Sequence, residues 1–321
     1  MALNYKETLQ HIAPGIEFLM TLYLTPSLTP EEIRKAKAAG IVGVKSYPHG
    51  VTTNSDQGVS SYEMYYPVFK AMEEEDMVLN LHGEVPSDAD TNACVLNAEP
   101  LFLPKLVSLH SAFPNLRIVL EHATTRAAVE CVKSLGDNVA CTITAHHLEL
   151  TVDDWAGQAF NFCKPVAKYP DDRKALREVV HEGHPRFFLG SDSAPHPHTA
   201  KTANISQVLQ LHSSSGNSSP APAPTSCAAG VYTSPILLPL VAELLESFGA
   251  LSKLQGFVST NGRKFYKREP DSKCQGITVT LKKESKNVPL VWSESHGVEH
   301  SVVPFRAGKS ISWHIVSRSG I

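Results

Sequence analysis

Four side chains that can bind a metal ion or carry a charge stand at the ends of apolar segments that read as strands. These residues are Lys45, His82, His122 and Asp192. Because the carboxyl ends of parallel strands open to one mouth in an α/β barrel, we expect them to meet in one cleft. Two imidazoles and a carboxylate suit Zn²⁺ or a similar ion. An ammonium cannot ligate a metal, but a lysine that has added CO₂ is a carbamate, which can bridge two cations.

Each of these residues, taken alone, has an ordinary structural explanation. A single histidine after an apolar strand is more often a core residue than a ligand, and Lys45 could extend its ammonium out of the barrel mouth. Asp192, in Gly-Ser-Asp-Ser, could cap a turn. The occurrence of all four on different strands of one predicted barrel favours the metal site.

The elements that must position these residues alternate between strand and helix over the first two thirds of the chain. Thr29, Pro30 and Glu32 form the signature of a helix start, with a capping box. The segment Ile16–Leu24 is apolar throughout, which predicts a strand buried on both faces. The strands expected are Ile16–Leu24, Ile41–Lys45, Met77–His82, Arg117–His122, Val139–Thr144 and Arg186–Gly190.

This alternation predicts an α/β fold, and single helices between strands favour a closed (β/α)8 barrel over an open sheet. Neither GxGxxG nor GxxxxGK[ST] occurs, so nucleotide-binding motifs of open sheets are absent. We expect a barrel domain over 1–270 with an extended, poorly ordered Ser/Pro-rich insertion at about 199–226. A β-rich segment over 271–321 is expected to pack on the barrel.

Composition excludes several classes of protein. The 321 residues are 42% hydrophobic with a net charge of −3, so no basic surface for nucleic acid is expected. No apolar run approaches the roughly 20 residues that a membrane span needs, and the N-terminus lacks the pattern of a signal peptide. The 6 cysteines form no CxxC pair, which favours reduced thiols in a cytoplasmic protein.

Several short stretches resemble the dihydroorotases, in particular the single-function type of bacteria and fungi within the amidohydrolase superfamily. The most specific of them is Gly190-Ser191-Asp192-Ser193-Ala194-Pro195-His196, and the order Lys, His, His, Asp at strand ends adds independent support. The others are Lys45-Ser46-Tyr47-Pro48, Thr52-Thr53-Asn54-Ser55, Leu81-His82-Gly83-Glu84, Glu121-His122-Ala123-Thr124-Thr125 and Thr142-Ile143-Thr144. The similarity extends over nearly the whole chain.

The resemblance implies a zinc-dependent enzyme that interconverts N-carbamoyl-L-aspartate and L-dihydroorotate, a small-molecule reaction of pyrimidine synthesis. Lys45 would be a carboxylated lysine that bridges two zinc ions. His82 and His122 would ligate the second ion, and His82 would also approach the substrate. Asp192 would ligate the first ion and carry the proton during ring opening and closure. A homodimer is expected for the complete protein.

The resemblance also implies a set of substrate-binding groups. His196 would bind the substrate carboxylate, helped by the backbone near Lys164 and Ala229. Thr52 and Thr53 would lie on a loop that closes over the bound substrate.

The sequence departs from the family at its start. The family begins with a strand that ends in His-x-His-x-Arg, whereas the one His-x-His here is His196-Pro197-His198. Six strands are found where barrel closure needs eight. We therefore expect a chain that lacks the first two strand–helix units and half of the first-metal site, and that is inactive and poorly folded as written. A non-catalytic barrel protein and a hydantoinase-like cyclic amidohydrolase are the alternatives.

Overall fold

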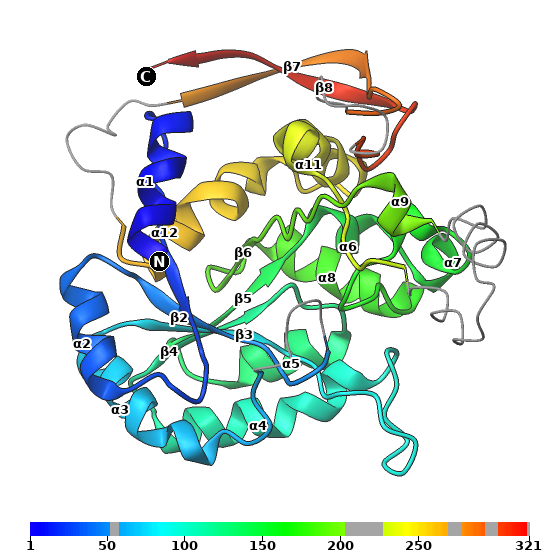
Figure 1. The fold of residues 1–321 in the computed structure, drawn as a ribbon. Coiled ribbons are helices and arrows are strands. Elements are labelled where there is room, and N and C mark those ends of the chain that lie inside the picture. Colours follow the sequence, from blue (N-terminus) through cyan, green and yellow to red (C-terminus); the bar gives the residue numbers. More distant parts are fainter. Residues whose placement is uncertain (52–57, 203–226, 269–277, 293–300, 320–321) are drawn as a thin grey trace, which may run out of the picture.

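The computed structural model describes residues 1–51, 58–202, 227–268, 278–292 and 301–319. Six strands form one parallel sheet, in which each strand pairs with its neighbour in the chain, in the order β1 to β6 (Figure 1). The strands are β1 (Thr21–Tyr23), β2 (Gly43–Ser46), β3 (Val78–His82), β4 (Arg117–Glu121), β5 (Val139–Ile143) and β6 (Phe187–Leu189). The carboxyl ends of all six strands therefore lie at the same end of the sheet, as the sequence predicts.

Helices connect these strands and cover the outer face of the sheet (Figure 1). The α-helices are α1 (Ala2–Ile12), α2 (Pro30–Ala38), α3 (Tyr66–Glu74), α4 (Ala98–Ala112), α5 (Arg126–Ser134), α6 (Ala145–Glu149), α7 (Val152–Trp155), α8 (Pro170–Glu182), α9 (His198–Lys201), α11 (Leu237–Ser247) and α12 (Asn261–Phe265). Short 3-10 turns are η1 (Glu63–Tyr65), η2 (Ala159–Asn161), η3 (Ser234–Ile236) and η4 (Leu251–Lys253), and η5 (Gly256–Thr260) is a π-helical turn. No helix of the described part is long and apolar enough to cross a membrane.

Local sequence signals explain where several of these helices begin. Thr29 caps α2 by accepting a hydrogen bond from the Glu32 amide at 3.3 Å, and Pro30 occupies the first turn. Thr125 caps α5 in the same way, through the Ala128 amide at 3.1 Å. These caps fix the point at which the chain leaves each strand-end loop.

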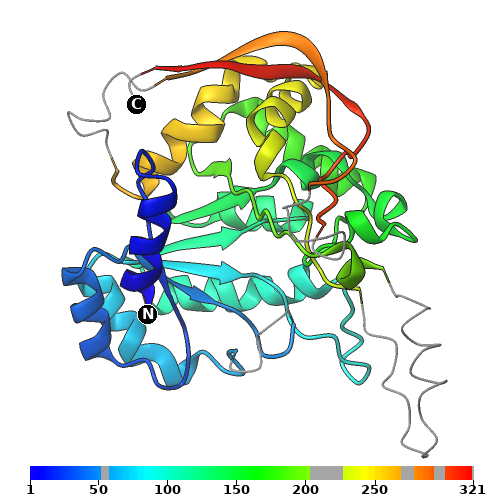
Figure 2. The same cartoon turned by 45° about the horizontal axis from the view of Figure 1, so that its top comes forward.

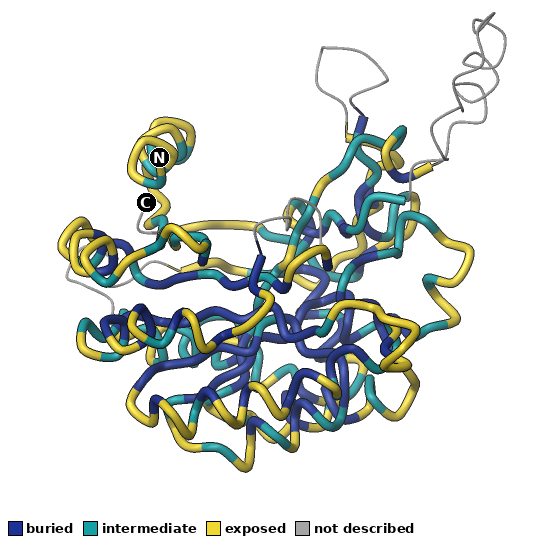
Figure 3. The backbone as a smooth tube through the Cα atoms, turned by 60° about the horizontal axis from the view of Figure 1, so that its bottom comes forward, coloured by how far each residue is buried: buried dark blue, intermediate teal, exposed yellow. Residues whose placement is uncertain are grey.

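The central strands are buried because both faces of the sheet are covered there. Every residue of β3 and β5 is buried, and Figure 3 shows that the buried backbone is concentrated in the sheet and its flanking helices. Successive side chains of a strand point to opposite faces of the sheet, so the buried side chains form two separate groups. One set of side chains packs against the helices, and a smaller set on the opposite, inner face consists of Val78, Val119, Ala140 and Phe188.

The expectation for Ile16–Leu24 is wrong in two respects. Only Thr21–Tyr23 form a strand, and of the expected segment only Leu24 is buried. The reason is the position of β1 at the sheet edge, where no described strand pairs with its outer side. Leu19, which is 39% exposed, lines a groove of about 610 Å³ between this edge, β6 and α12.

The C-terminal region forms a separate antiparallel pair, β7 (Thr278–Asn287) with β8 (Ser310–Ser319). This pair arches over α11 and α12 (Figure 2). Within the expected β-rich segment 271–321, residues 288–292 form no strand, and Trp292 makes an isolated bridge to Val302. Of the insertion expected at about 199–226, residues 199–201 belong to α9. Most of that insertion, like Thr52 and Thr53, lies outside the described residues.

Candidate active site

The histidines at the ends of two neighbouring strands lie side by side. His82 ends β3 and His122 follows β4, and their ring centroids are 4.7 Å apart. Both side chains are buried. Burial and the neighbouring charges keep the pKa of His122 well below its usual value, so that its imidazole is neutral. A neutral imidazole is the form that ligates metals.

The backbone around His122 is held in an uncommon conformation. Its φ is 45°, and its amide donates to Thr142 Oγ1 on β5 at 2.7 Å. The next turn is fixed by the buried Glu99, whose carboxylate accepts from the Thr124 amide at 2.9 Å and the Thr125 hydroxyl at 2.5 Å. Within the described residues His122 Nδ1 has no hydrogen-bond partner although it is buried. Such an orphaned ring nitrogen fits a missing ligand or ion.

His82 is oriented by a buried carboxylate. Its Nε2 donates to Glu84 Oε2 at 2.8 Å, and Lys168 Nζ lies 3.8 Å from the other oxygen of Glu84. Burial alone would raise the pKa of Glu84, but the hydrogen bond from His82 and the charge of Lys168 hold that pKa below its usual value. The carboxylate fixes the tautomer of His82, as such partners do for metal-binding histidines.

Lys45 extends from β2 toward the same site. Its Nζ contacts the carboxylate of Glu121, which also accepts from Asn80 Nδ2 at 3.1 Å. Burial lowers the pKa of Lys45 to about 7, and the charge of Asp192 opposes that shift. At neutral pH a large fraction of the amine is therefore uncharged, and the uncharged amine is the form that adds CO₂.

Asp192 stands at the rim of the site. It follows β6 with a φ of 40° and is exposed, although the surrounding protein atoms desolvate its carboxylate and raise its pKa. The charges of Lys45 and His82 act against that rise, which places both residues within electrostatic reach of Asp192. In the described part of the chain, Asp192 does not form a compact three-ligand group with His82 and His122.

The residues expected to bind substrate lie beside this rim. His196 Nε2 contacts the Ala229 carbonyl at 3.1 Å, and Lys164 Nζ donates to the Val51 carbonyl at 2.9 Å. Among the described residues, the amides of Lys164 and Ala229 donate to no acceptor. Free N–H groups and an imidazole are groups that can bind a carboxylate.

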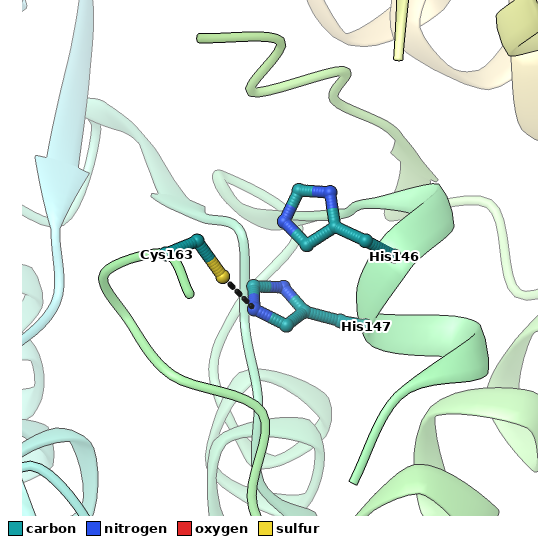
Figure 4. A group of neighbouring side chains, drawn as sticks. All are labelled: His146, His147 and Cys163. Atoms are coloured by element: carbon teal, nitrogen blue, oxygen red, sulfur yellow. Dashed lines mark hydrogen bonds between the residues drawn. The ribbon is translucent and has the colours of Figure 1, made fainter. Parts of the chain in front are cut away.

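Sequence reasoning missed a second buried polar group next to the site. His146, His147 and Cys163 are fully buried, with one ligand atom of each lying within 4.8 Å of the others (Figure 4). Such a group can in principle hold a metal ion. However, His147 Nε2 already donates to the Pro165 carbonyl at 3.0 Å, and tetrahedral zinc needs ligand atoms about 3.3–3.6 Å apart. The adjacent pair His146-His147 after a strand was the available signal.

Sequence reasoning also missed the carboxylates that support the expected ligands. Glu84 and Glu121 stand two residues after His82 and one residue before His122, so their proximity in sequence could have suggested them. Glu99 is far in sequence from the turn it holds, and no local pattern predicts that contact.

Comparison with known proteins places this geometry in a family. Residues 5–130 match the family described as amidohydrolase. A dihydroorotase of Mycosarcoma maydis is 53% identical to this chain, and the match covers 98% of this chain and 86% of the relative. The Saccharomyces cerevisiae dihydroorotase is 45% identical, and that match covers 98% of this chain and 84% of the relative. The crystal structure of the S. cerevisiae dihydroorotase with 5-fluoroorotic acid superposes with a TM-score of 0.86 at 43% identity, covering 98% of this chain and 84% of that one. A D-hydantoinase structure, at 14% identity and a TM-score of 0.74, shares the fold.

Proposed function

The chain belongs to the dihydroorotase family, enzymes that act on a cyclic amide, and on that premise we propose that its site is built for the zinc-dependent interconversion of N-carbamoyl-L-aspartate and L-dihydroorotate. The expectation that the chain as written is inactive stays a prediction, which the turnover assay below tests. The observation that carries this proposal is the convergence of His82, His122 and Lys45 at the ends of three adjacent strands. A cytoplasmic location and a homodimer stay predictions.

The residues present fit a metal site. His82 and His122 would hold one ion, Lys45 as a carbamate would help to hold both ions, and Asp192 would help to hold the other, for which the expected His-x-His ligands do not occur near the start of the sequence. The orphaned Nδ1 of His122 and the lowered pKa of Lys45 support this assignment. When bound, divalent zinc would polarise the ring carbonyl and make water acidic enough to attack it at neutral pH.

Asp192 acts as the proton carrier in this proposal. During hydrolysis of dihydroorotate it accepts a proton from the attacking water and delivers it to the ring nitrogen that leaves the carbonyl carbon. During cyclisation the proton moves in the opposite direction. A desolvation-raised pKa suits this role, because a carboxyl group exchanges protons best when its pKa approaches the working pH.

Substrate orientation comes from the groups beside the rim. His196 and the free amides of Lys164 and Ala229 would bind the carboxylate that is common to dihydroorotate and carbamoyl aspartate. This contact would turn the scissile amide toward Asp192 and His82.

The test compares Asp192→Ala with Asp137→Ala, a control at a carboxylate that is fully exposed. We expect Asp192→Ala to lower kcat by ~10²-fold or more, because general acid–base groups contribute about that much. The Asp137 variant should match the unaltered protein. Turnover of dihydroorotate, hydantoin and dihydrouracil is measured together with zinc content.

Retention of more than about a tenth of the activity in Asp192→Ala would contradict the role of this residue. Faster turnover of hydantoin than of dihydroorotate would favour a hydantoinase-like enzyme instead. A zinc-loaded protein with no turnover of any substrate would favour the non-catalytic alternative.

A further inference from the structure

Lys201 is a buried lysine whose charge is balanced by no carboxylate in the described part of the chain. It ends α9, and the residue is 4% exposed. Its Nζ donates to the carbonyls of Phe162 at 2.9 Å, Ala228 at 2.8 Å and Gly230 at 2.8 Å. All three ammonium hydrogens are thereby used. Burying a lysine is costly unless its donors are satisfied, so this arrangement calls for an explanation.

The three carbonyls belong to two separate backbone segments that meet at this ammonium. One segment is 162–164 and the other is 228–230. The Gly230 amide also donates directly to the Phe162 carbonyl at 3.0 Å, and the Ala228 amide donates to Ala200 at 2.9 Å. Lys201 therefore ties α9 to both segments at one point.

The same two segments carry the free amides described above, those of Lys164 and Ala229. Segment 228–230 also packs against His196, because a Cβ on Gly230 would lie 2.8 Å from Cδ2 of that imidazole and 2.5 Å from the Ala194 carbonyl oxygen. Movement of the first segment would therefore displace the Lys164 amide, and movement of the second would displace the Ala229 amide and the His196 ring.

We propose that Lys201 is a positioning residue for the substrate carboxylate, holding the amides of Lys164 and Ala229 and the ring of His196 in a fixed arrangement. Three carbonyl oxygens that converge on one point repel one another, and a cation between them removes that repulsion. The Ala229 amide lies in the same peptide group as the Ala228 carbonyl that Lys201 binds, and the Lys164 amide lies in the peptide that follows the one carrying the Phe162 carbonyl. A carboxylate that binds to these amides therefore meets donors that are already oriented. Lys201 itself touches neither substrate nor metal.

This inference rests on the proposed function, and kinetics test it. Lys201→Met keeps an unbranched side chain that is one atom shorter and removes all three donors. The matched control is Lys37→Met, because Lys37 also donates to two backbone carbonyls, those of Glu75 and Asp76, at the opposite end of β3. We expect KM for dihydroorotate to rise roughly tenfold or more in Lys201→Met, with kcat within about threefold. In Lys37→Met both constants should stay unchanged.

Hydrogen exchange measured by mass spectrometry gives a readout that does not depend on turnover. Lys201→Met should accelerate exchange of amides in 159–165 and 228–232, while Lys37→Met leaves these peptides unchanged. If Lys201→Met does not fold, Lys201→Gln, which keeps two N–H donors without the charge, is measured against the same expectations. Lys201→Arg should restore part of the affinity, because its guanidinium can reach some of the carbonyls.

A KM within about twofold of the unaltered protein, together with unchanged exchange in both segments, would overturn the inference. An equal rise in KM for Lys37→Met would also overturn it, because the effect would then reflect stability alone. If the unaltered, zinc-loaded protein does not turn over dihydroorotate, the proposed function fails and this inference fails with it. An active protein with an unmoved KM would refute only the role of Lys201.

Discussion

The buried carboxyl group of Glu99 gives the sharpest test of the electrostatics around the site. It stands in the first turn of α4, is 1% exposed, and accepts hydrogen bonds from Thr124 and Thr125. Burial raises its pKa to about 7, while the charge of Lys168 and these hydrogen bonds oppose the rise. Which effect prevails decides the sign of its contribution to stability.

A raised pKa means that the folded protein holds a proton that the unfolded chain releases. Between pH about 4.5 and about 7 the folded state therefore binds more protons, and the free energy of unfolding falls as the pH rises through this window. A pKa that rises from 4.5 to about 7 corresponds to about 3 kcal/mol. Below pH about 4.5 that contribution is fully present, and above pH about 7.5 it has been lost.

The assay is urea denaturation of the protein and of Glu99→Gln at closely spaced pH values from 4 to 8. The variant cannot titrate at this position, so the difference between the two unfolding free energies isolates Glu99. That difference should fall by about 3 kcal/mol across the window. Glu130→Gln, at an exposed position on α5, serves as the control. A difference that stays flat or rises with pH would show that the hydrogen bonds outweigh burial, and would refute this reasoning.

Three further predictions concern the site and the sheet edge. Lys45→Ala should lose zinc and lower turnover at least ~10²-fold, and added acetate should restore part of that turnover. An unmodified amine at Lys45 in a zinc-loaded crystal would contradict the carbamate. Thr142→Val leaves the His122 amide without its acceptor and should cost about 1–3 kcal/mol in urea denaturation, whereas Thr142→Ser should not. Leu19→Lys, beside the side of β1 on which no described strand pairs, should raise the concentration at which light scattering detects aggregates. An unchanged threshold would argue against edge pairing.

Local patterns predicted most of the elements, because each pattern carries its own physical cause. The Thr29 cap predicted α2, and runs such as Met77–His82 predicted strands that are buried on both faces. The same reasoning failed at Ile16–Leu24, because among the described residues the edge strand β1 pairs with a neighbour on only one side. Apolar composition shows that a segment can be buried, but it does not show whether the rest of the fold covers it.

The sequence could predict only those site residues that stand at the ends of predicted strands. The convergence of His82 and His122 follows from parallel pairing, since any two adjacent parallel strands bring their carboxyl ends together. The partners of these residues depend on register, and register places Glu121 beside His82 in the sheet. The three carbonyls around Lys201 depend on loops that contact across dozens of residues, and no sequence period reports such contacts.

The backbone conformation of two proposed ligands has a consequence for protein engineering. His122 and Asp192 have φ values of 45° and 40°, a region that costs a residue with a side chain roughly 1–3 kcal/mol and costs glycine almost nothing. Glycine at either position would relieve that strain while removing the proposed ligand. Local backbone strain and the proposed metal binding therefore make opposite demands on these two positions. In a library selected for heat resistance, both codons should be held fixed so that glycine does not replace a proposed ligand.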